Sequence, residues 1–301
     1  MGRERAFVSV IVPTCGRLAG IARCLQALAR QTYPADQMEV ILVDDGSDGD
    51  VETAVFSLTL PFPVHCIRQS RRGPAAARNT GARRARGQLL AFTDDDCEPA
   101  PNWLTQLVSA HYHHPVAMLG GHTINANADN LYAAASQMLT NFVSQHSRHD
   151  PTQPPFFPSN NIAIPRQQFW QAGGFDETMP LAAGEDRAFC AHWIQQGWPL
   201  VFVPDAVVQH RQLLNGWSFW QQQWRYGRGA WQWRQRYAGE RGRKVANWRF
   251  YWQLIRYPGT AVTGPQRLPL TILFLIAQIA VGTGYTYEKL KRKSPSSEGP
   301  A

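Results

Sequence analysis

Three consecutive carboxylates, Asp94, Asp95 and Asp96, follow directly on an apolar run at residues 89–92. Carboxylates that are crowded together repel one another and are costly to bury without partners. A solvated turn would accommodate them, and the two prolines that follow favour a turn. A cation site would also accommodate them, because Mg²⁺ and Mn²⁺ prefer hard oxygen ligands and often carry a phosphorylated substrate. These three residues alone leave both interpretations open.

The segments around this cluster alternate between strand-like and helix-like patterns. Apolar and β-branched residues fill residues 7–14, 38–45 and 88–92, which we expect to be buried strands. Apolar residues recur at helical spacing in residues 17–33 until a proline ends the pattern, and the Ala-rich segment 73–87 is also of helical type. This alternation predicts an α/β fold with parallel strands joined by right-handed crossovers.

The predicted parallel sheet brings the polar residues at its strand ends to one edge, where ligands bind in open sheets of this kind. The residues that the sequence places there are Pro13 and Thr14, then Asp44 and Asp45, then Asp94, Asp95 and Asp96. Two acidic clusters that both follow buried strands favour one shared binding site over two unrelated turns.

Length and composition predict a globular protein with an intracellular setting. The chain has 301 residues, of which 44% are hydrophobic, enough for one large domain with an appendage or for two smaller domains. The five cysteines show no C-x-x-C spacing, and we expect no signal peptide at the charged N-terminus. A reducing compartment is therefore expected.

Charge divides the chain into two parts. Residues 1–210 carry 15 Lys and Arg against 19 Asp and Glu, whereas residues 211–301 carry 15 against 3. Seven of the eleven tryptophans also lie in the second part. Basic residues interleaved with aromatics are typical of nucleic-acid binding and equally of a membrane interface. We therefore predict a domain at 1–211 and a basic, helical tail at 212–301.

Six segments, in order, resemble family 2 glycosyltransferases of the GT-A, nucleotide-diphospho-sugar transferase fold, and together they span residues 7–210. They are VSVIVPTCGR, ILVDDGSDGD, GPAAARNTGARRARG, FTDDDCEP, SNNIAIPRQQFWQAGGFDE and GEDRAFCAHWIQQGWPLVFVPDAVVQH. The resemblance implies a Rossmann-like, mostly parallel sheet flanked by helices. It also implies transfer of a sugar from a nucleotide diphosphate, with a UDP-sugar as the default donor.

The resemblance implies a donor site at the strand ends. Pro13, Thr14, Asp44 and Asp45 would hold the nucleotide, since carboxylates accept from base N–H groups and ribose hydroxyls. A plain turn remains the alternative for Asp44 and Asp45.

Divalent Mg²⁺ or Mn²⁺ would stabilise the departing diphosphate as a Lewis acid. The family's D-x-D motif holds this cation. The resemblance makes Asp96 a metal ligand whether the motif here is Asp94-x-Asp96 or the pair Asp95 and Asp96, and Asp94 would turn toward the ribose. His210 matches the family position that completes the metal site, and a surface histidine is the alternative.

The acceptor hydroxyl needs a general base, which the resemblance assigns to the Asp of an acidic pair at the start of a helix. Asp186 matches this residue, with Glu185 in a supporting or acceptor-binding role. Carboxylates in a first helical turn also favour the helix dipole, so capping is a compatible alternative. Because no second nucleophile is evident, the transfer is expected to invert the anomeric carbon.

Other residues match family positions near the donor or the acceptor. These are Arg78, Ser159, Asn160, Asn161, Trp224, Arg225 and Arg228.

Two other functions compete with sugar transfer. A nucleotidyltransferase of similar fold would begin with a Gly-rich phosphate loop, which PTCGRLAG matches poorly. An inactive module that binds sugar or nucleic acid would be expected to lack part of the constellation, yet Asp96, Asp186 and His210 are all present. We expect a nucleotide-sugar donor, a lipid, lipid-linked or polysaccharide acceptor of the cell envelope, and no nucleic-acid partner.

Residues 268–287 carry no charge over 20 positions, about the length needed to cross a bilayer. Basic residues flank both ends: Arg256 and Arg267 before it, and Lys289, Lys291, Arg292 and Lys293 after it. Because both flanks favour the cytoplasmic side, we expect the segment to lie in the interface or to re-enter, holding the protein on the cytoplasmic face of a membrane. A buried helix of a soluble domain is the alternative.

Overall fold

The computed structural model describes residues 5–149, 155–179, 183–236 and 248–291. Eight strands form one sheet in the order β3-β2-β1-β4-β7-β6-β8-β5. They are β1 (Val8–Thr14), β2 (Met38–Asp45), β3 (Val64–Gln69), β4 (Leu89–Phe92), β5 (Cys97–Pro99), β6 (Met118–Asn125), β7 (Ile162–Pro165) and β8 (Leu200–His210).

Parallel pairing dominates the half of the sheet that precedes the aspartate cluster. β3, β2, β1 and β4 pair in parallel, as the alternating pattern of the sequence predicts. β7 then enters antiparallel to β4 and to β6, whereas β6 and β8 are again parallel. The short β5, which leads directly out of the three aspartates, pairs antiparallel with the end of β8. This last pairing brings residues 94–97 and His210 to the same edge.

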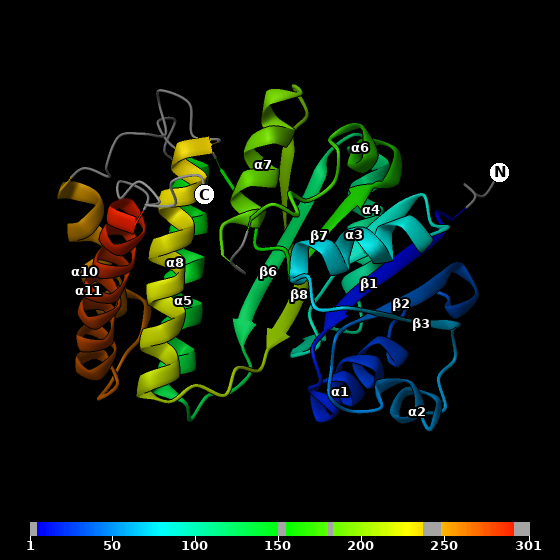
Figure 1. Ribbon diagram of the computed structural model, residues 1–301, viewed down its shortest axis with the longest axis horizontal. Coiled ribbons are helices and arrows are strands. Elements are labelled where there is room, and N and C mark those ends of the chain that lie inside the picture. Colours follow the sequence, from blue (N-terminus) through cyan, green and yellow to red (C-terminus); the bar gives the residue numbers. More distant parts are fainter. Residues whose placement is uncertain (1–4, 150–154, 180–182, 237–247, 292–301) are drawn as a thin grey trace, which may run out of the picture.

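Helices cover both faces of the sheet (Figure 1). They are α1 (Leu18–Ala29), α2 (Val51–Phe56), α3 (Pro74–Arg84), α4 (Trp103–His113), α5 (Leu131–His149), α6 (Arg166–Gln171), α7 (Glu185–Gln195), α8 (Gly216–Arg236), α10 (Trp248–Ala261) and α11 (Arg267–Lys291), with a short 3₁₀ turn, η1 (Ala35–Gln37).

Alternate residues of the central strands build two separate cores. Val8, Val10 and Val12 of β1 face α1 and α4, whereas Ile11 faces the opposite layer of α3, α6 and α7. This period of two is the expected result of a strand that is buried on both faces. The sheet is thereby fixed between two apolar layers, and its polar strand ends are free to form a site.

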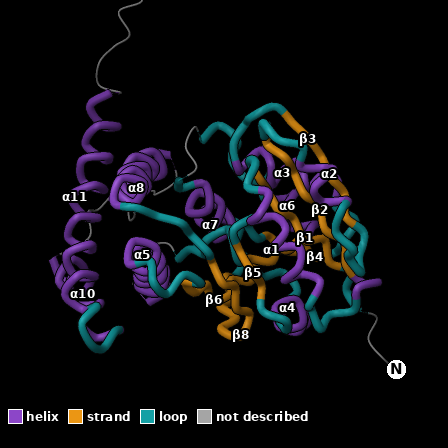
Figure 2. Tube along the Cα trace, turned by 90° about the horizontal axis from the view of Figure 1, so that it is seen from below, coloured by secondary structure: helices purple, strands orange, loops and turns teal. Residues whose placement is uncertain are grey.

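A third apolar cluster joins four long helices beside the sheet. It includes Leu139 and Phe142 of α5, Phe219 of α8, Leu254 of α10 and Phe274 of α11. Figure 2 shows α10 and α11 on the outer side of α5 and α8, farthest from the strands. The tail predicted at 212–301 is therefore helical where it is described, and its helices share a core with α5.

α8 and α11 approach each other at backbone distance. A Cβ atom added to Gly227 of α8 would lie 2.0 Å from the carbonyl oxygen of Val281, and one added to Gly284 of α11 would lie 2.1 Å from that of Trp224. Arg228 and Gln232 of α8 also bind Glu288 of α11, each at 2.7 Å. α11 is thus fastened along α8.

α11 contains the whole uncharged segment 268–287. Among the residues that the structure describes, it alone is long and apolar enough to cross a membrane. Of the basic residues predicted to flank it, Arg292 and Lys293 lie outside the described residues.

Candidate active site

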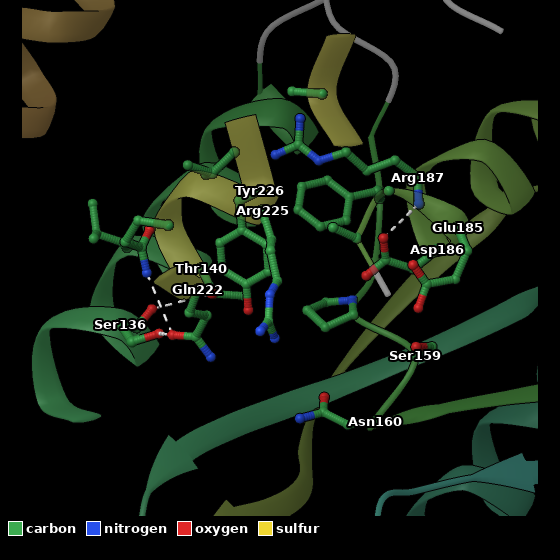
Figure 3. A pocket seen from close by; sticks show the side chains of 18 of the residues that line it. Ser136, Thr140, Ser159, Asn160, Glu185, Asp186, Arg187, Gln222, Arg225 and Tyr226 are labelled. Atoms are coloured by element: carbon green, nitrogen blue, oxygen red, sulfur yellow. Dashed lines mark hydrogen bonds between the residues drawn. The ribbon is translucent and has the colours of Figure 1, made fainter. Parts of the chain in front are cut away.

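A cavity of about 930 Å³ lies between the strand ends and the helices α5, α7, α8, α10 and α11. In Figure 3, Glu185 and Asp186 point into it, with Ser159 and Asn160 below them and Arg225 and Tyr226 across from them. Twelve of the residues predicted from the sequence line it: Pro13, Thr14, Asp45, Arg78, Asp94, Asp96, Ser159, Asn160, Glu185, Asp186, His210 and Arg225. The predicted crevice at the strand ends is therefore present.

Arg78 links two of the acidic groups. Its guanidinium is buried, donating from Nη2 to Asp94 Oδ1 at 2.8 Å and from Nη1 to Glu185 Oε1 at 3.4 Å. A buried charge requires partners, and α3 supplies this one because its Ala-rich face packs closely on β1 and β2. Arg78 thus holds the end of β4 and the start of α7 together.

Asp95 is turned away from the cavity. Its side chain is fully buried, accepting from Thr14 Oγ1 at 2.6 Å and pairing with Arg17. Burial raises the pKa of the Asp95 carboxyl, and Arg17 and Thr14 oppose that change. Asp95 is not among the residues that line the cavity, so it is not placed for the predicted contact with the donor. Its bond with Thr14 instead ties the end of β4 to β1.

Asp96 and His210 form the predicted metal pair. Asp96 Oδ1 lies 3.3 Å from His210 Nε2, and Asp96 Oδ2 accepts from Arg17 Nη1 at 2.7 Å. Burial opposes the charged form, but His210 and then Arg17 lower the pKa of Asp96 to about 2. The carboxylate is therefore ionised at neutral pH.

The hydrogen bonds of Gln137 decide which nitrogen of His210 is free. Gln137 Nε2 donates to Thr123 O and to Asn141 Oδ1, so its Oε1 must accept from His210 Nδ1, at 3.0 Å. A neutral ring then presents the lone pair of Nε2 to Asp96, which is unfavourable unless a proton or a cation lies between them. This arrangement, with the second nitrogen held by a carbonyl, is the one that metal-binding histidines adopt.

The residues present therefore fit a divalent cation. Cys97 lies close to the same pair, with ligand atoms of the three side chains within 4.8 Å of one another. Burial raises the pKa of the Cys97 thiol well above its usual value, so the thiol stays protonated. Asp96 and His210 remain as the oxygen and nitrogen ligands that Mn²⁺ or Mg²⁺ accepts.

The two aspartates at the end of β2 have different surroundings. Asp44 Oδ1 accepts from Ser47 N at 2.9 Å, which is the turn that the sequence left open as an alternative. Asp45 lines the cavity and accepts from Arg72 N at 2.8 Å and from Gly73 N at 2.7 Å. Only Asp45 is thus placed to contact a ligand in the cavity.

Glu185 and Asp186 begin α7 after Gly184, whose φ of +96° favours glycine. Burial, and then the charge of Asp186, raise the pKa of Glu185 to about 7. Burial also raises the pKa of Asp186, whose Oδ1 accepts from Arg187 N at 2.7 Å. Glu185 Oε2 is buried and has no hydrogen-bond partner among the described residues. A pair of carboxyl groups with raised pKa in a cavity is typical of proton transfer.

Three other predicted contacts lie outside the lining. Asn161 Oδ1 accepts from the buried Trp103 indole at 2.8 Å and so braces β7 against α4. Trp224 packs on Tyr287, and Arg228 pairs with Glu288, so both belong to the junction of α8 with α11.

The lining residues that the sequence interpretation missed include the polar side chains of Arg17, Arg187, Tyr226 and Arg234. Arg17 had a signal, because it follows β1 within the conspicuous TCGR loop. Arg187 adjoins Asp186 in the sequence and was also accessible to reasoning. Tyr226 and Arg234 depend on how α8 is rotated, which the sequence does not reveal.

Comparison with known proteins connects this geometry with sugar transfer. The model of the family described as Glycosyl transferase family 2 matches residues 9–173. Glycosyltransferase AglE of Haloferax volcanii is 31% identical over 232 residues, which cover 74% of this chain and 72% of that protein. The pre-mycofactocin glycosyltransferase of Mycobacterium tuberculosis is 30% identical over 227 residues, which cover 72% of this chain but 45% of that protein.

Solved structures share the fold. A mannosyltransferase from Pyrobaculum calidifontis in complex with GDP-Man and Mn²⁺ superposes with a TM-score of 0.66 at 19% identity, covering 95% of this chain and 89% of that one. GalNAc-T7 with UDP, GalNAc and Mn²⁺ gives a TM-score of 0.56 at 20% identity, covering 96% of this chain and 57% of that one. These similarities confirm the expected GT-A-like architecture.

Proposed function

The chain belongs to glycosyltransferase family 2, and from this premise we propose that it is a metal-dependent, inverting enzyme. It transfers a sugar from a nucleotide diphosphate to a hydroxyl of a lipid, lipid-linked or polysaccharide acceptor at the cytoplasmic face of a membrane. The observation that carries the proposal is the pairing of Asp96 with His210 beside Asp94, inside a cavity that also holds Asp186.

The donor lies across the strand ends. Asp45 and Thr14 contact the nucleoside, and Asp94 accepts from a ribose hydroxyl while its ion pair with Arg78 fixes its position. Asn160 and Ser159 contact the donor sugar. Asp95, Asp44 and Asn161 act as positioning residues, because each is buried and engaged by neighbouring groups. UDP is the default nucleotide, and Mn²⁺ with UDP or GDP-Man in structures of similar fold supports a metal-carried donor.

Asp96 and His210 would hold Mn²⁺ or Mg²⁺, which when bound supplies a positive charge for the departing diphosphate. Arg17 lies against the other oxygen of the Asp96 carboxylate and adds a second positive charge at the mouth of the site. The metal ion and Arg17 would therefore both lie on the side of the site where the diphosphate leaves.

Asp186 takes the proton of the acceptor hydroxyl. The backbone N–H of Arg187 fixes the orientation of its carboxylate, and burial raises its pKa toward the range where a base is effective. Glu185, whose pKa burial and the charge of Asp186 raise to about 7, lies beside this base and supports acceptor binding. One displacement by one base inverts the anomeric centre.

α11 supports action at a membrane surface. Its inner face packs on α8 and α10, whereas Leu268, Ile272, Leu275 and Ile279 are between 43% and 70% exposed at helical spacing. Basic residues lie at both ends of this stripe, Arg267 before it and Lys289 and Lys291 after it, all exposed. An apolar stripe between basic ends suits the interface of an anionic leaflet, where each basic residue near the surface contributes about 1 kcal/mol.

A donor screen tests the proposal. The full-length protein with membrane extract as acceptor is incubated with UDP-, GDP- and TDP-sugars, and release of the nucleoside diphosphate is measured with Mn²⁺ and with EDTA. The proposal expects release from one donor class, with metal only. Release of pyrophosphate from a nucleoside triphosphate and a sugar phosphate would instead identify a nucleotidyltransferase.

A further inference from the structure

The cavity extends well beyond the carboxylates into a second arm between the helices α5, α8, α10 and α11. Five apolar side chains line this arm: Leu139, Val143, Phe250, Leu254 and Val281. Polar but uncharged groups accompany them, including Ser136, Thr140 and Gln222, which Figure 3 places on the side away from Glu185. A nucleotide sugar at the strand ends does not need such an apolar channel.

Three arginines line the same cavity, and they are Arg187, Arg225 and Arg234. Arg187 lies over the Phe156 ring at 4.3 Å, and Arg234 lies 5.5 Å from the Tyr285 ring. Arg234 Nε is buried without a hydrogen-bond partner in the described part of the chain. Burial lowers the pKa of Arg187, Asp186 opposes this, and the like charge of Arg234 lowers it further.

These arginines differ from the others around the cavity. Arg17 and Arg78, which also line the cavity, each pair with a carboxylate. No ion pair to a carboxylate joins Arg187, Arg225 or Arg234 to any residue within the described ranges. Guanidinium groups that lack a carboxylate partner can bind an anionic group of a ligand. The apolar channel beside them can bind an apolar chain attached to that group.

Resting on the proposed function, we propose that this arm binds the acceptor and that the acceptor is an amphiphile with a phosphate head. Arg225, Arg187 and Arg234 hold the phosphate, the channel between α5 and α10 takes the apolar chain, and the accepting hydroxyl is directed to Asp186. The adjacency of Arg187 and Asp186 in α7 places the head group next to the general base.

The outer helices α10 and α11 give the apolar chain of the acceptor a route from the membrane into the cavity. Tyr251 of α10 lines the cavity and is 38% exposed, and the neighbouring Trp252 is 55% exposed. α10 shares an apolar cluster with α11, which carries the exposed apolar stripe. An acceptor anchored in the membrane therefore enters the arm from the side of α10.

The test is equilibrium binding of radiolabelled dodecyl phosphate to the full-length protein in phosphatidylcholine nanodiscs, with empty nanodiscs subtracted. Saturable binding is expected, and inorganic phosphate or dodecyl maltoside at equal concentration should not displace it. Arg225→Gln, at an exposed position that tolerates the change, should raise the Kd about tenfold or more, and Arg234→Gln should do the same. Val143→Phe, which fills the channel, should weaken binding similarly, whereas Arg84→Gln on the exposed face of α3 should leave it unchanged.

Nucleotide binding by the same samples separates the two claims. If UDP or GDP with Mn²⁺ binds but dodecyl phosphate does not, or if the Arg225 and Arg234 variants bind it as wild type does, the acceptor arm is overturned alone. Displacement by inorganic phosphate as strong as by dodecyl phosphate would overturn the apolar channel. Absence of any nucleotide binding would overturn the proposed function itself.

Discussion

Asp186 is the residue on which the chemical step depends most. Replacement by Asn preserves its shape and removes its basicity, so transfer should fall by a factor of about 10² to 10⁴. Nucleotide affinity, measured by calorimetry, should stay nearly unchanged, since Asp186 does not contact the nucleotide in this account. Asp205→Asn, at an exposed position on β8, is the matched control. A collapse of nucleotide affinity in the Asp186 variant would make Asp186 a binding residue instead.

Glu185 predicts a dependence of stability on pH. Its pKa is about 7 in the folded state against a usual value of 4.5. Between these values the unfolded chain releases the proton and the folded chain keeps it, so stability falls as pH rises from about 4.5 to 7 and stays low above that. The cost at pH 8 is on the order of 3 kcal/mol.

Glu185→Gln should remove this cost. In urea unfolding, the variant should gain stability over wild type at pH 8 and show little difference at pH 4.5. Asp129→Asn, in an exposed loop, should keep the wild-type dependence. An equal difference between Glu185→Gln and wild type at both pH values would contradict the assignment.

Most of the site residues predicted from the sequence line the cavity, because a residue that follows a buried strand in a parallel sheet has little choice of location. Asp94 and Asp96 both line the cavity for this reason, yet Asp95 between them is buried against Thr14 and Arg17, because the three aspartates lie in a turn that Cys97 N closes by donating to Asp94 O. For α8, reasoning from the sequence could not tell which residues face the cavity. Arg225 lines the cavity whereas Arg228 binds Glu288. Which face of a helix lines a site depends on the elements that pack against that helix.

At the scale of elements, the crossing of α8 and α11 positions the outer wall of the cavity. Gly284 lies where any Cβ would meet the carbonyl of Trp224 at 2.1 Å, and backbone cannot move aside as a side chain can. Gly284→Ala should therefore destabilise the protein by about 1 to 3 kcal/mol. Thermal unfolding followed by circular dichroism measures this.

Gly282, two residues away on the same helix, is the control. A Cβ there meets nothing within 4 Å. Gly282→Ala should then stabilise α11 by up to about 1 kcal/mol through helix propensity alone. Equal effects of the two substitutions would mean that α8 and α11 do not cross as described.

The elements that the sequence predicted best are those with one dominant pattern. The three early strands and the helix at Arg267–Lys291 follow from uniform apolar runs. The antiparallel entry of β7 and the pairing of β5 with β8 were not predictable, because strand direction depends on long-range pairing that leaves no local pattern. That pairing brings His210 to Asp96, so the metal pair was inferred from resemblance and not from spacing.

At the scale of the whole molecule, the exposed stripe of α11 predicts binding to membranes. Full-length protein should sediment with vesicles of phosphatidylcholine and phosphatidylglycerol, and less so at high salt. Replacing Ile272 and Ile279 with Ser should weaken binding more than tenfold, since about 2 kcal/mol of apolar transfer is lost. Phe56→Ser alters an equally exposed side chain on α2, far from α11 in Figure 1, and should change nothing.

Protein that stays in the supernatant at low salt, or equal loss of binding in the Phe56 variant, would contradict this orientation. A soluble helix core would then be the better account of α11. The domain limits at 211 and 212 stay a prediction, and since α5 shares an apolar core with α8 and α11, we propose that the two parts fold as one unit.

The most direct test of the central claim is the metal dependence of nucleoside diphosphate release at Asp96. Wild type, Asp96→Ala and the control Asp205→Ala are compared with the active donor over a titration of Mn²⁺, and again in EDTA. Wild type and Asp205→Ala should turn over with saturable dependence on Mn²⁺ and stop in EDTA, whereas Asp96→Ala should remain folded and inactive at every concentration. Full turnover by wild type in EDTA, or by Asp96→Ala at any Mn²⁺ concentration, would contradict the account.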